Sequence, residues 1–77
     1  MSVFIVEYCD GECGTIIGVH NDPVDAKACV LSHLSEMESV EREVAERIGG
    51  YAISEWEIGG QNRKSAAYFN IGTKEWT

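Results

Sequence analysis

The chain of 77 residues carries 13 acidic and 6 basic side chains, for a net charge of −7. This length predicts one domain, residues 1–77, with a core near the lower size limit, which added stability from a partner subunit, a ligand or a metal would suit. The negative charge repels phosphate groups and so argues against direct nucleic-acid binding, whereas it suits docking onto a basic protein surface. No apolar run approaches the ~20 residues that cross a bilayer and no signal peptide is recognised, so we predict a cytoplasmic protein that does not contact membranes.

Two short β-branched segments at the start of the chain predict a hairpin. Residues 2–8 include Val-Phe-Ile-Val, residues 15–20 read Thr-Ile-Ile-Gly-Val-His, and both are too short for helices. The turn residues at 9–14 make the two strands antiparallel neighbours. The first strand is apolar on both faces near its start, which predicts a central position in the sheet.

Residues 22–48 form the only helix-length segment, and both of its ends are marked. Asp22 can accept hydrogen bonds from the free amides of the first turn, and Pro23 has no amide hydrogen that would be left unpaired there. Arg47 places a cation in the last turn. Gly49 and Gly50 then predict the end of the helix through a left-handed cap.

The apolar side chains of this segment form two stripes that point in different directions. The first stripe consists of Val24, Ala28 and Leu31, with Cys29 and Leu34 beside it, and the second consists of Met37, Val40, Val44 and Ile48. One straight helix cannot press both stripes onto one sheet. Either the helix breaks near residues 35–39, where Ser35 and Glu38 have the spacing of a capping box, or one long helix offers its second stripe to another molecule. We favour the second stripe as the seam of a homodimer, and we predict that the glutamate-rich side is solvated.

Two further strands are predicted after the helix. Residues 51–58 form a third strand, with Tyr51 and Ile53 on one face, Trp56 and Ile58 on the other, and a bulge near residues 54–55. A polar loop leads to a fourth strand at residues 66–71, and the tail at 72–77 is expected to fray. The predicted fold is an α+β domain of ββαββ order: an antiparallel sheet of three to four strands, the third beside the first, with one long or kinked helix packed on one face.

The cysteines and histidines give half of a metal-binding set. Cys9 and Cys13 lie in the hairpin loop, and a second pair of ligands is missing unless Cys29 and His20 converge on them. Cys29 is most simply a small buried hydrophobic residue. We therefore predict no metal and no cofactor, and we keep a zinc- or thiol-dependent protein that uses Cys9, Cys13 and His20 as an alternative. No spacing typical of a catalytic group is present, so the chain is predicted not to be an enzyme.

Aromatic and basic residues supply the candidate binding site. Tyrosine and tryptophan are typical anchors of binding surfaces, and adjacent cations can meet a phosphate or an acidic group. The predicted partner- or ligand-binding residues are Trp56, Tyr51, Tyr8, Arg63, Lys64 and Asn62. The alternative is that these residues form ordinary core aromatics and a solvated loop.

The pattern of residues 3–58 resembles that of small phage-encoded ββαβ proteins. The similar stretches are Val3 to Val6, Ile16 to Val19, Asn21 to Ala26 at the helix start, and Tyr51 to Ile58. The Thoeris anti-defence family is similar in having a hairpin that ends in an Ile-Gly-Val-like strand, followed by a helix rich in alanine and acid. Proteins of that family sequester a cyclic ADP-ribose-type immune signal as oligomers, without cleaving it.

Together these features predict a non-catalytic phage or prophage accessory protein that binds and inhibits a host defence protein in the host cytoplasm. Small size, acidic charge and surplus aromatics are the basis of this prediction. The first alternative, which the resemblance implies, is an oligomeric sponge for a cyclic nucleotide or ADP-ribose-type signal. The predicted partners are thus a host protein or a small nucleotide-type ligand, with a homodimer as the assembly.

Overall fold

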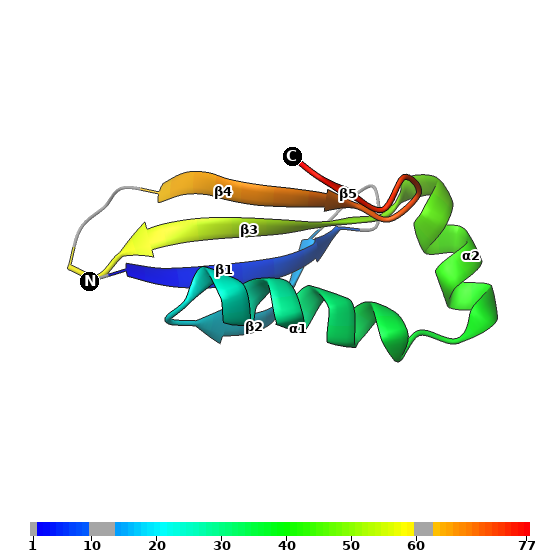
Figure 1. Cartoon of the computed structure of the whole chain (residues 1–77), viewed down its shortest axis with the longest axis horizontal. Helices are drawn as coiled ribbons and strands as arrows, with labels where there is room; N and C mark the ends of the chain where they lie inside the picture. Colours follow the sequence, from blue (N-terminus) through cyan, green and yellow to red (C-terminus); the bar gives the residue numbers. More distant parts are fainter. Residues whose placement is uncertain (1, 10–13, 60–62) are drawn as a thin grey trace.

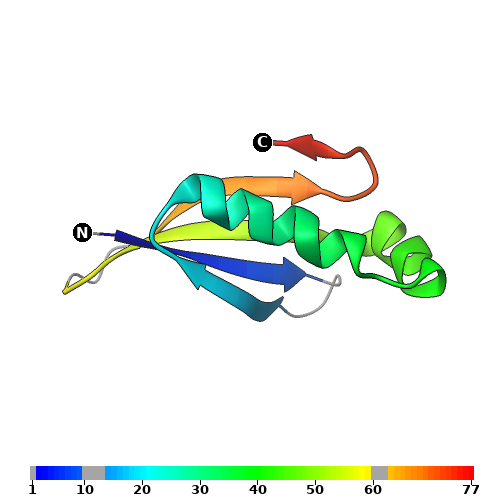
Figure 2. The ribbon, with the colours of Figure 1, turned by 60° about the horizontal axis from the view of Figure 1, so that its bottom comes forward.

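A computed structural model of the chain describes residues 2–9, 14–59 and 63–77. Its elements are β1 (Ser2–Cys9), β2 (Gly14–His20), α1 (Pro23–Ser35), α2 (Ser39–Ile48), β3 (Gly50–Glu57), β4 (Arg63–Asn70) and β5 (Glu75–Trp76). The strands form one antiparallel sheet in the order β2-β1-β3-β4-β5. In Figures 1 and 2, α1 runs across one face of this sheet, while α2 lies beyond the ends of the strands.

The predicted fold class is wrong in the number of strands and in the number of helices. The sheet has five strands rather than three to four, and two short helices replace the one long or kinked helix. The α+β character and the position of the third strand beside the first are confirmed. The fifth strand comes from the tail for which we predicted fraying, because Trp76 packs on the Phe69 ring at 4.9 Å and lies 5.1 Å from the Lys27 amino group of α1.

The helical segment begins where the sequence predicts. The Val24 amide donates to Oδ1 of Asp22 at 2.7 Å, and Pro23 occupies the first turn. The chain leaves the helix at Gly49, but the predicted left-handed cap is wrong, since Gly49 has φ −97° and ψ 160°. The extended backbone at Gly49 lets the chain pass directly into β3 at Gly50.

The break between the helices falls at residues 36–38, within the predicted range. The capping box does not form, because the Ser35 hydroxyl donates to the Ser32 carbonyl and Glu38, the N-cap of α2, makes no side-chain bond. Arg42 of α2 reaches back instead, and its Nη2 donates to the carbonyls of Leu34 (2.9 Å) and Ser35 (3.4 Å). A cation at this position satisfies terminal carbonyls of α1 and holds the two helices at an angle.

The face of α1 that we predicted to contact the sheet points away from it. Val24 and Leu31 are 71% and 52% exposed, and Ala28 is also exposed. Ala26 and Val30, on the opposite side of the helix, are the residues that α1 buries. The spacing rule detects an apolar stripe, but it does not decide which of two such faces meets the sheet.

The core lies between α1 and one face of the sheet. Its buried side chains are Val6, Ala26, Val30, Met37, Ala45, Tyr51, Ile53, Ala67, Phe69 and Ile71. The strand register explains the set, because Val6 pairs with Ile53 and Tyr51 pairs with Phe69, and paired residues lie on the same face. We call this side the helix face.

A bulge lies in β4 rather than in the third strand, where it was predicted. Ile53 is opposite Ala67 and Ser54 is opposite Ser65, so Ala66 is the extra residue. β3 alternates without interruption against β1. Among the described residues, neither helix is long and apolar enough to span a membrane.

Candidate functional site

The sheet face opposite α1 is apolar, and no described segment forms a layer over it. Successive strand residues point to opposite faces, so the neighbours of the core positions project here. The register groups them, since Val3 pairs with Trp56, Ile5 with Val19, Glu7 with Ile16, and Ala52 with Tyr68. Ile16 and Val19 are 60% and 58% exposed. We call this surface the open face and define its apolar part as Val3, Ile5, Ile16, Val19, Ala52, Trp56 and Tyr68.

A network around Arg63 joins Ser54, Glu7 and Trp56 on the open face. The Nε and Nη2 atoms of Arg63 donate to Oγ of Ser54 at 3.3 and 3.1 Å, and the guanidinium lies 5.7 Å from the Trp56 ring centre. Nη2 is also 3.9 Å from Oε1 of Glu7. Ser54 is only 3% exposed beneath this arginine. The cation on the open face thus already has a carboxylate, an acceptor and an aromatic ring as neighbours.

A second apolar surface lies on α2. Val40, Val44 and Ile48 are each more than half exposed and share one side of the helix, which we call the α2 ridge. Met37, the fourth residue of the predicted dimer seam, is 8% exposed and belongs to the core. The stripe predicted from the sequence therefore has three members at the surface and one inside.

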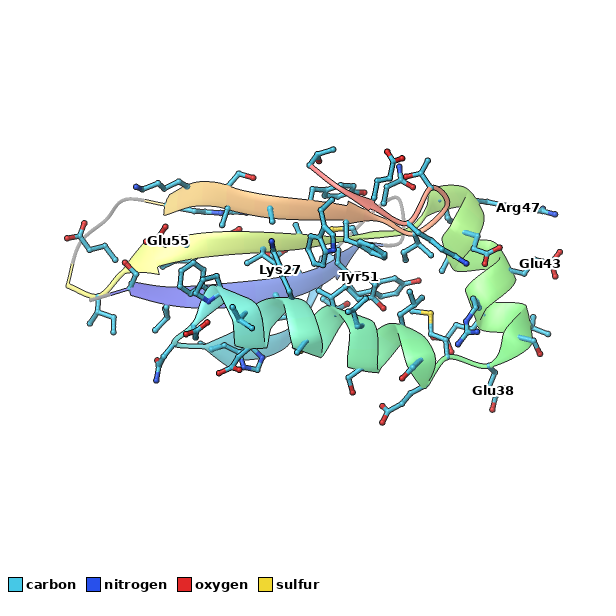
Figure 3. All side chains as sticks on the ribbon, viewed as in Figure 1. Lys27, Glu38, Glu43, Arg47, Tyr51 and Glu55 are labelled. Atoms are coloured by element: carbon cyan, nitrogen blue, oxygen red, sulfur yellow. The ribbon has the colours of Figure 1, made fainter. Side chains whose placement is uncertain are left out.

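An acidic hollow lies where α2 approaches α1. It has a volume of about 220 Å³ and is lined by His33, Glu36, Met37 and Glu41. Glu43 is 3.5 Å from Arg47, and no other glutamate between residues 36 and 48 makes an ion pair with the described part of the chain. Figure 3 shows Glu38, Glu43 and Arg47 projecting from α2 away from the sheet. α2 carries three glutamates and two arginines, and Glu36 and Glu38 precede it, so this end of the molecule is acidic overall.

A larger hollow lies on the other side of α2. It measures about 300 Å³, with an apolar floor and a charged rim, and is lined by Leu31, Leu34, Ser35, Arg42, Glu46, Ile71 and Lys74. Arg42 is already bonded to the end of α1. Lys74 has φ 60°, a conformation that costs an ordinary residue about 1 kcal/mol. This volume is at the lower limit of the range of about 300–1,000 Å³ that is typical for ligand pockets.

Tyr51 and Tyr8, predicted as binding residues, lie together on the helix face. Tyr51 is fully buried, and its hydroxyl is joined to Nδ1 of His33 by a hydrogen bond of 2.6 Å. The ring centre of Tyr8 lies 5.3 Å from that of Tyr51 and 5.5 Å from that of His33. Figure 3 shows Tyr51 between α1 and the sheet. The buried Tyr51 is a core residue and offers no surface to a partner, which corrects its place in the predicted site.

The basic pair predicted at the binding site is divided between the two faces. Arg63 is paired with Trp56 on the open face, whereas Lys64 is paired with Glu55 on the helix face. Lys64 borders a hollow of about 260 Å³ with Ser2, Glu55 and Glu57. Asn62 lies outside the described residues. Of the predicted set, the structure thus brings Trp56 and Arg63 together on the open face, and Tyr8 and Tyr51 together on the helix face.

The candidate metal ligands do not form a cluster among the described residues. Cys9 pairs with Gly14 and Gly50 at one end of β1, while His20 pairs with Phe4 nearer the other end. Cys13 lies outside the described residues. His20 and Cys29 both approach Gly18, and Nε2 of His20 is buried without a hydrogen-bond partner. No group of three His, Cys, Asp or Glu side chains that could hold a metal ion is found in residues 2–9, 14–59 and 63–77.

Glu7 and Ser54 are the site residues that the sequence did not reveal. Both face the same side as Trp56, and both contact Arg63. Their two-residue spacing from neighbouring open-face positions is the signal that could have identified them. His33 was likewise passed over, because its contact with Tyr51 joins residues 18 positions apart.

No family model, no curated protein and no solved structure matches this chain. The class of protein is therefore defined by the fold and its surfaces alone: a two-layer α+β domain with an open sheet face and an acidic helical end. The resemblance to the Thoeris anti-defence family stays a prediction.

Proposed function

We propose that this chain is a non-catalytic binding protein that docks its acidic helical end onto a basic, grooved surface of a protein partner. The α2 ridge carries this proposal, because it exposes three β-branched side chains beside a hollow lined by glutamates. Apolar helix faces of this kind commonly insert into grooves of partner proteins.

Charge sets the kind of partner. Glu36 and Glu41 at the hollow have no cation within ion-pair distance among the described residues, so a lysine or arginine of the partner would pair with them. The net charge of −7 would also speed the approach of a basic surface. Following the sequence resemblance, we propose a bacterial defence protein as this partner and inhibition by occlusion as the effect. The sponge alternative has no observation on the described residues that favours it.

Capture from bacterial lysates, with variants that separate the surfaces, tests this function. We expect the wild-type chain to retain one partner in stoichiometric amount, and Val44→Asp or Glu41→Lys to lower the retained amount at least about tenfold. Val24→Asp is the matched control, since Val24 is a valine on α1, away from the ridge, that is at least as exposed as Val44. About 0.5 M salt should weaken the capture, because rim charges are screened.

Two results would contradict the proposal. One is that wild-type protein retains no stoichiometric partner from the lysates of several bacterial hosts. The other is that Val44→Asp and Glu41→Lys retain as much of the partner as Val24→Asp does. Circular dichroism on each variant confirms that the fold is kept.

A further inference from the structure

We infer that the open face of the sheet is covered by a second copy of this chain, so that two sheets stack face to face in a symmetric dimer. This dimer goes beyond the proposed function, which uses the α2 end of the molecule and not the open face. It rests on the shape, the composition and the charge of the open face.

The open face is too apolar to be an ordinary solvent-exposed surface. Its seven apolar residues are contributed by four adjacent strands, from Val19 at the β2 edge to Tyr68 on β4. Contiguous apolar patches of this extent usually mark an interface. The chain exposes 5174 Å² in total, whereas about 4,700 Å² is typical of a compact monomer of 8.5 kDa. The excess agrees with a domain whose second layer is supplied from outside.

The charge of the open face favours a second copy of the chain as the molecule that covers it. Of the described charged residues, β1 to β4 place only Glu7 and Arg63 on the open face, 3.9 Å apart, and Glu75 follows on the same face at the β5 edge. Two copies of a chain with charge −7 repel each other through most of their surface, and this nearly neutral face is where that repulsion is smallest. A basic foreign protein would instead be attracted to the glutamates of the helical end. Stacking through the open face leaves both helical ends pointing outward.

The Arg63 network of the open face is already internally paired. Arg63 already donates to Ser54, stacks near Trp56 and faces Glu7, so covering the network leaves no isolated charge. The rest of the face consists mainly of aliphatic and aromatic side chains, as at the core of homodimer interfaces.

The area is adequate for a specific dimer. A strand of eight residues is about 26 Å long, and four such strands at about 4.8 Å spacing give a projected area of about 500 Å² per copy. Two copies then bury about 1,000 Å², without the extra area of protruding side chains, and this reaches the threshold for a biological interface. The three residues of the α2 ridge cover far less, so the sheet face, rather than the ridge, is our candidate dimer surface.

Mass measurement on matched variants tests the inference. Sedimentation equilibrium of the wild-type chain should give twice the 8.5 kDa of one copy. Val19→Glu and Trp56→Glu should each raise the dimer dissociation constant at least about 100-fold, because each would bury two unpaired carboxylates. Leu31→Glu on α1 and Val44→Asp on α2 replace residues of similar exposure to Val19 and should leave the mass unchanged. Tyr68→Glu replaces Trp56→Glu if the latter fails to fold by circular dichroism.

Three outcomes would overturn the inference. They are a single-copy mass at every concentration up to about 100 µM, loss of the dimer in Leu31→Glu or Val44→Asp instead, and loss in Val19→Glu alone. The last result would indicate pairing through the β2 edge, since Trp56 lies on an inner strand. The dimer surface and the partner surface can be tested separately. If monomeric Val19→Glu still captures the partner, and Val44→Asp stays dimeric but captures none, the two surfaces act independently.

Discussion

Replacing Tyr51 by alanine should lower the free energy of unfolding by about 3–5 kcal/mol, the range seen when a large buried aromatic side chain is deleted. Tyr51 is fully buried, and its ring lies 5.3 Å from that of Tyr8 and 6.5 Å from that of Phe69. Tyr51 lies at the start of β3 and is bonded to His33 of α1, so its removal leaves a cavity between α1 and the sheet. Urea denaturation followed by circular dichroism measures the change.

The hydroxyl group of Tyr51 can be tested separately. Tyr51→Phe keeps the ring but leaves Nδ1 of His33 without its partner at 2.6 Å, so we expect a loss of about 1–2 kcal/mol. Tyr68→Phe is the control, since the Tyr68 side chain is partly exposed and makes no hydrogen bond among the described residues, and it should change stability by less than about 0.5 kcal/mol. Equal effects of Tyr51→Phe and Tyr68→Phe would show that the bond to His33 contributes nothing.

Alkaline pH gives an independent reading of the same hydroxyl. Burial, and then the neighbouring Tyr8 and Glu41, raise the pKa of Tyr51 above its ordinary value of 10.0. Above about pH 10 the unfolded chain releases this proton while the folded chain keeps it, so the free energy of unfolding falls as the pH rises. Tyr51→Phe lacks this loss. The stability difference between wild type and Tyr51→Phe should therefore shrink between pH 8 and pH 11, and a constant difference would contradict the burial of the hydroxyl.

Gly49→Ala should destabilise the fold by about 1–3 kcal/mol, the usual cost of overpacking. A methyl group at Gly49 would lie 2.8 Å from the carbonyl oxygen of Ala45 and 3.2 Å from Cδ1 of Ile71. The backbone angles at Gly49 suit any residue, so the close approach of the last turn of α2 and of Ile71 to this position is the reason for glycine here. Because the carbonyl oxygen belongs to the backbone, it cannot move aside without disturbing α2.

Gly14→Ala is the matched control for this prediction. The atom that its methyl group would meet is Oε2 of Glu7, at 2.6 Å, which is the end of a flexible side chain. We expect a change below about 0.5 kcal/mol, measured by urea denaturation. A Gly49→Ala variant as stable as Gly14→Ala would contradict the close approach of Ala45 and Ile71 to this position.

The features that local chemistry specifies were predicted well from the sequence. Asp22 followed by Pro23 defines the helix start through one hydrogen bond and one missing amide hydrogen, both of which depend on neighbouring residues alone. The hairpin of β1 and β2, and the place of β3 beside β1, follow from short β-branched runs around a turn.

The features that depend on tertiary contacts were not predicted from the sequence. Val24 and Leu31 form an apolar stripe as regular as a core-facing one, yet Ala26 and Val30 are the residues that α1 buries. β5 has two residues, and its formation depends on the packing of Trp76 against Phe69, a contact that no local pattern encodes.

The candidate site shows the same division. Arg63 and Lys64 are adjacent in sequence and read as one basic patch, but strand alternation sends them to opposite faces of the sheet. The fourth strand was predicted to begin only at residue 66, because the polar residues before it were assigned to a loop, whereas β4 begins at Arg63. Trp56 and Arg63 could be paired only once the register was known.

α1 covers one face of the sheet, and we propose that a second copy of the chain covers the other. Nuclear Overhauser contacts between labelled and unlabelled chains in a mixed sample measure this directly. We predict intermolecular contacts from Ile5, Val19 and Trp56 to the same face of the other copy. Intermolecular contacts confined to Leu31 or to the α2 ridge, or none at millimolar concentration, would contradict it.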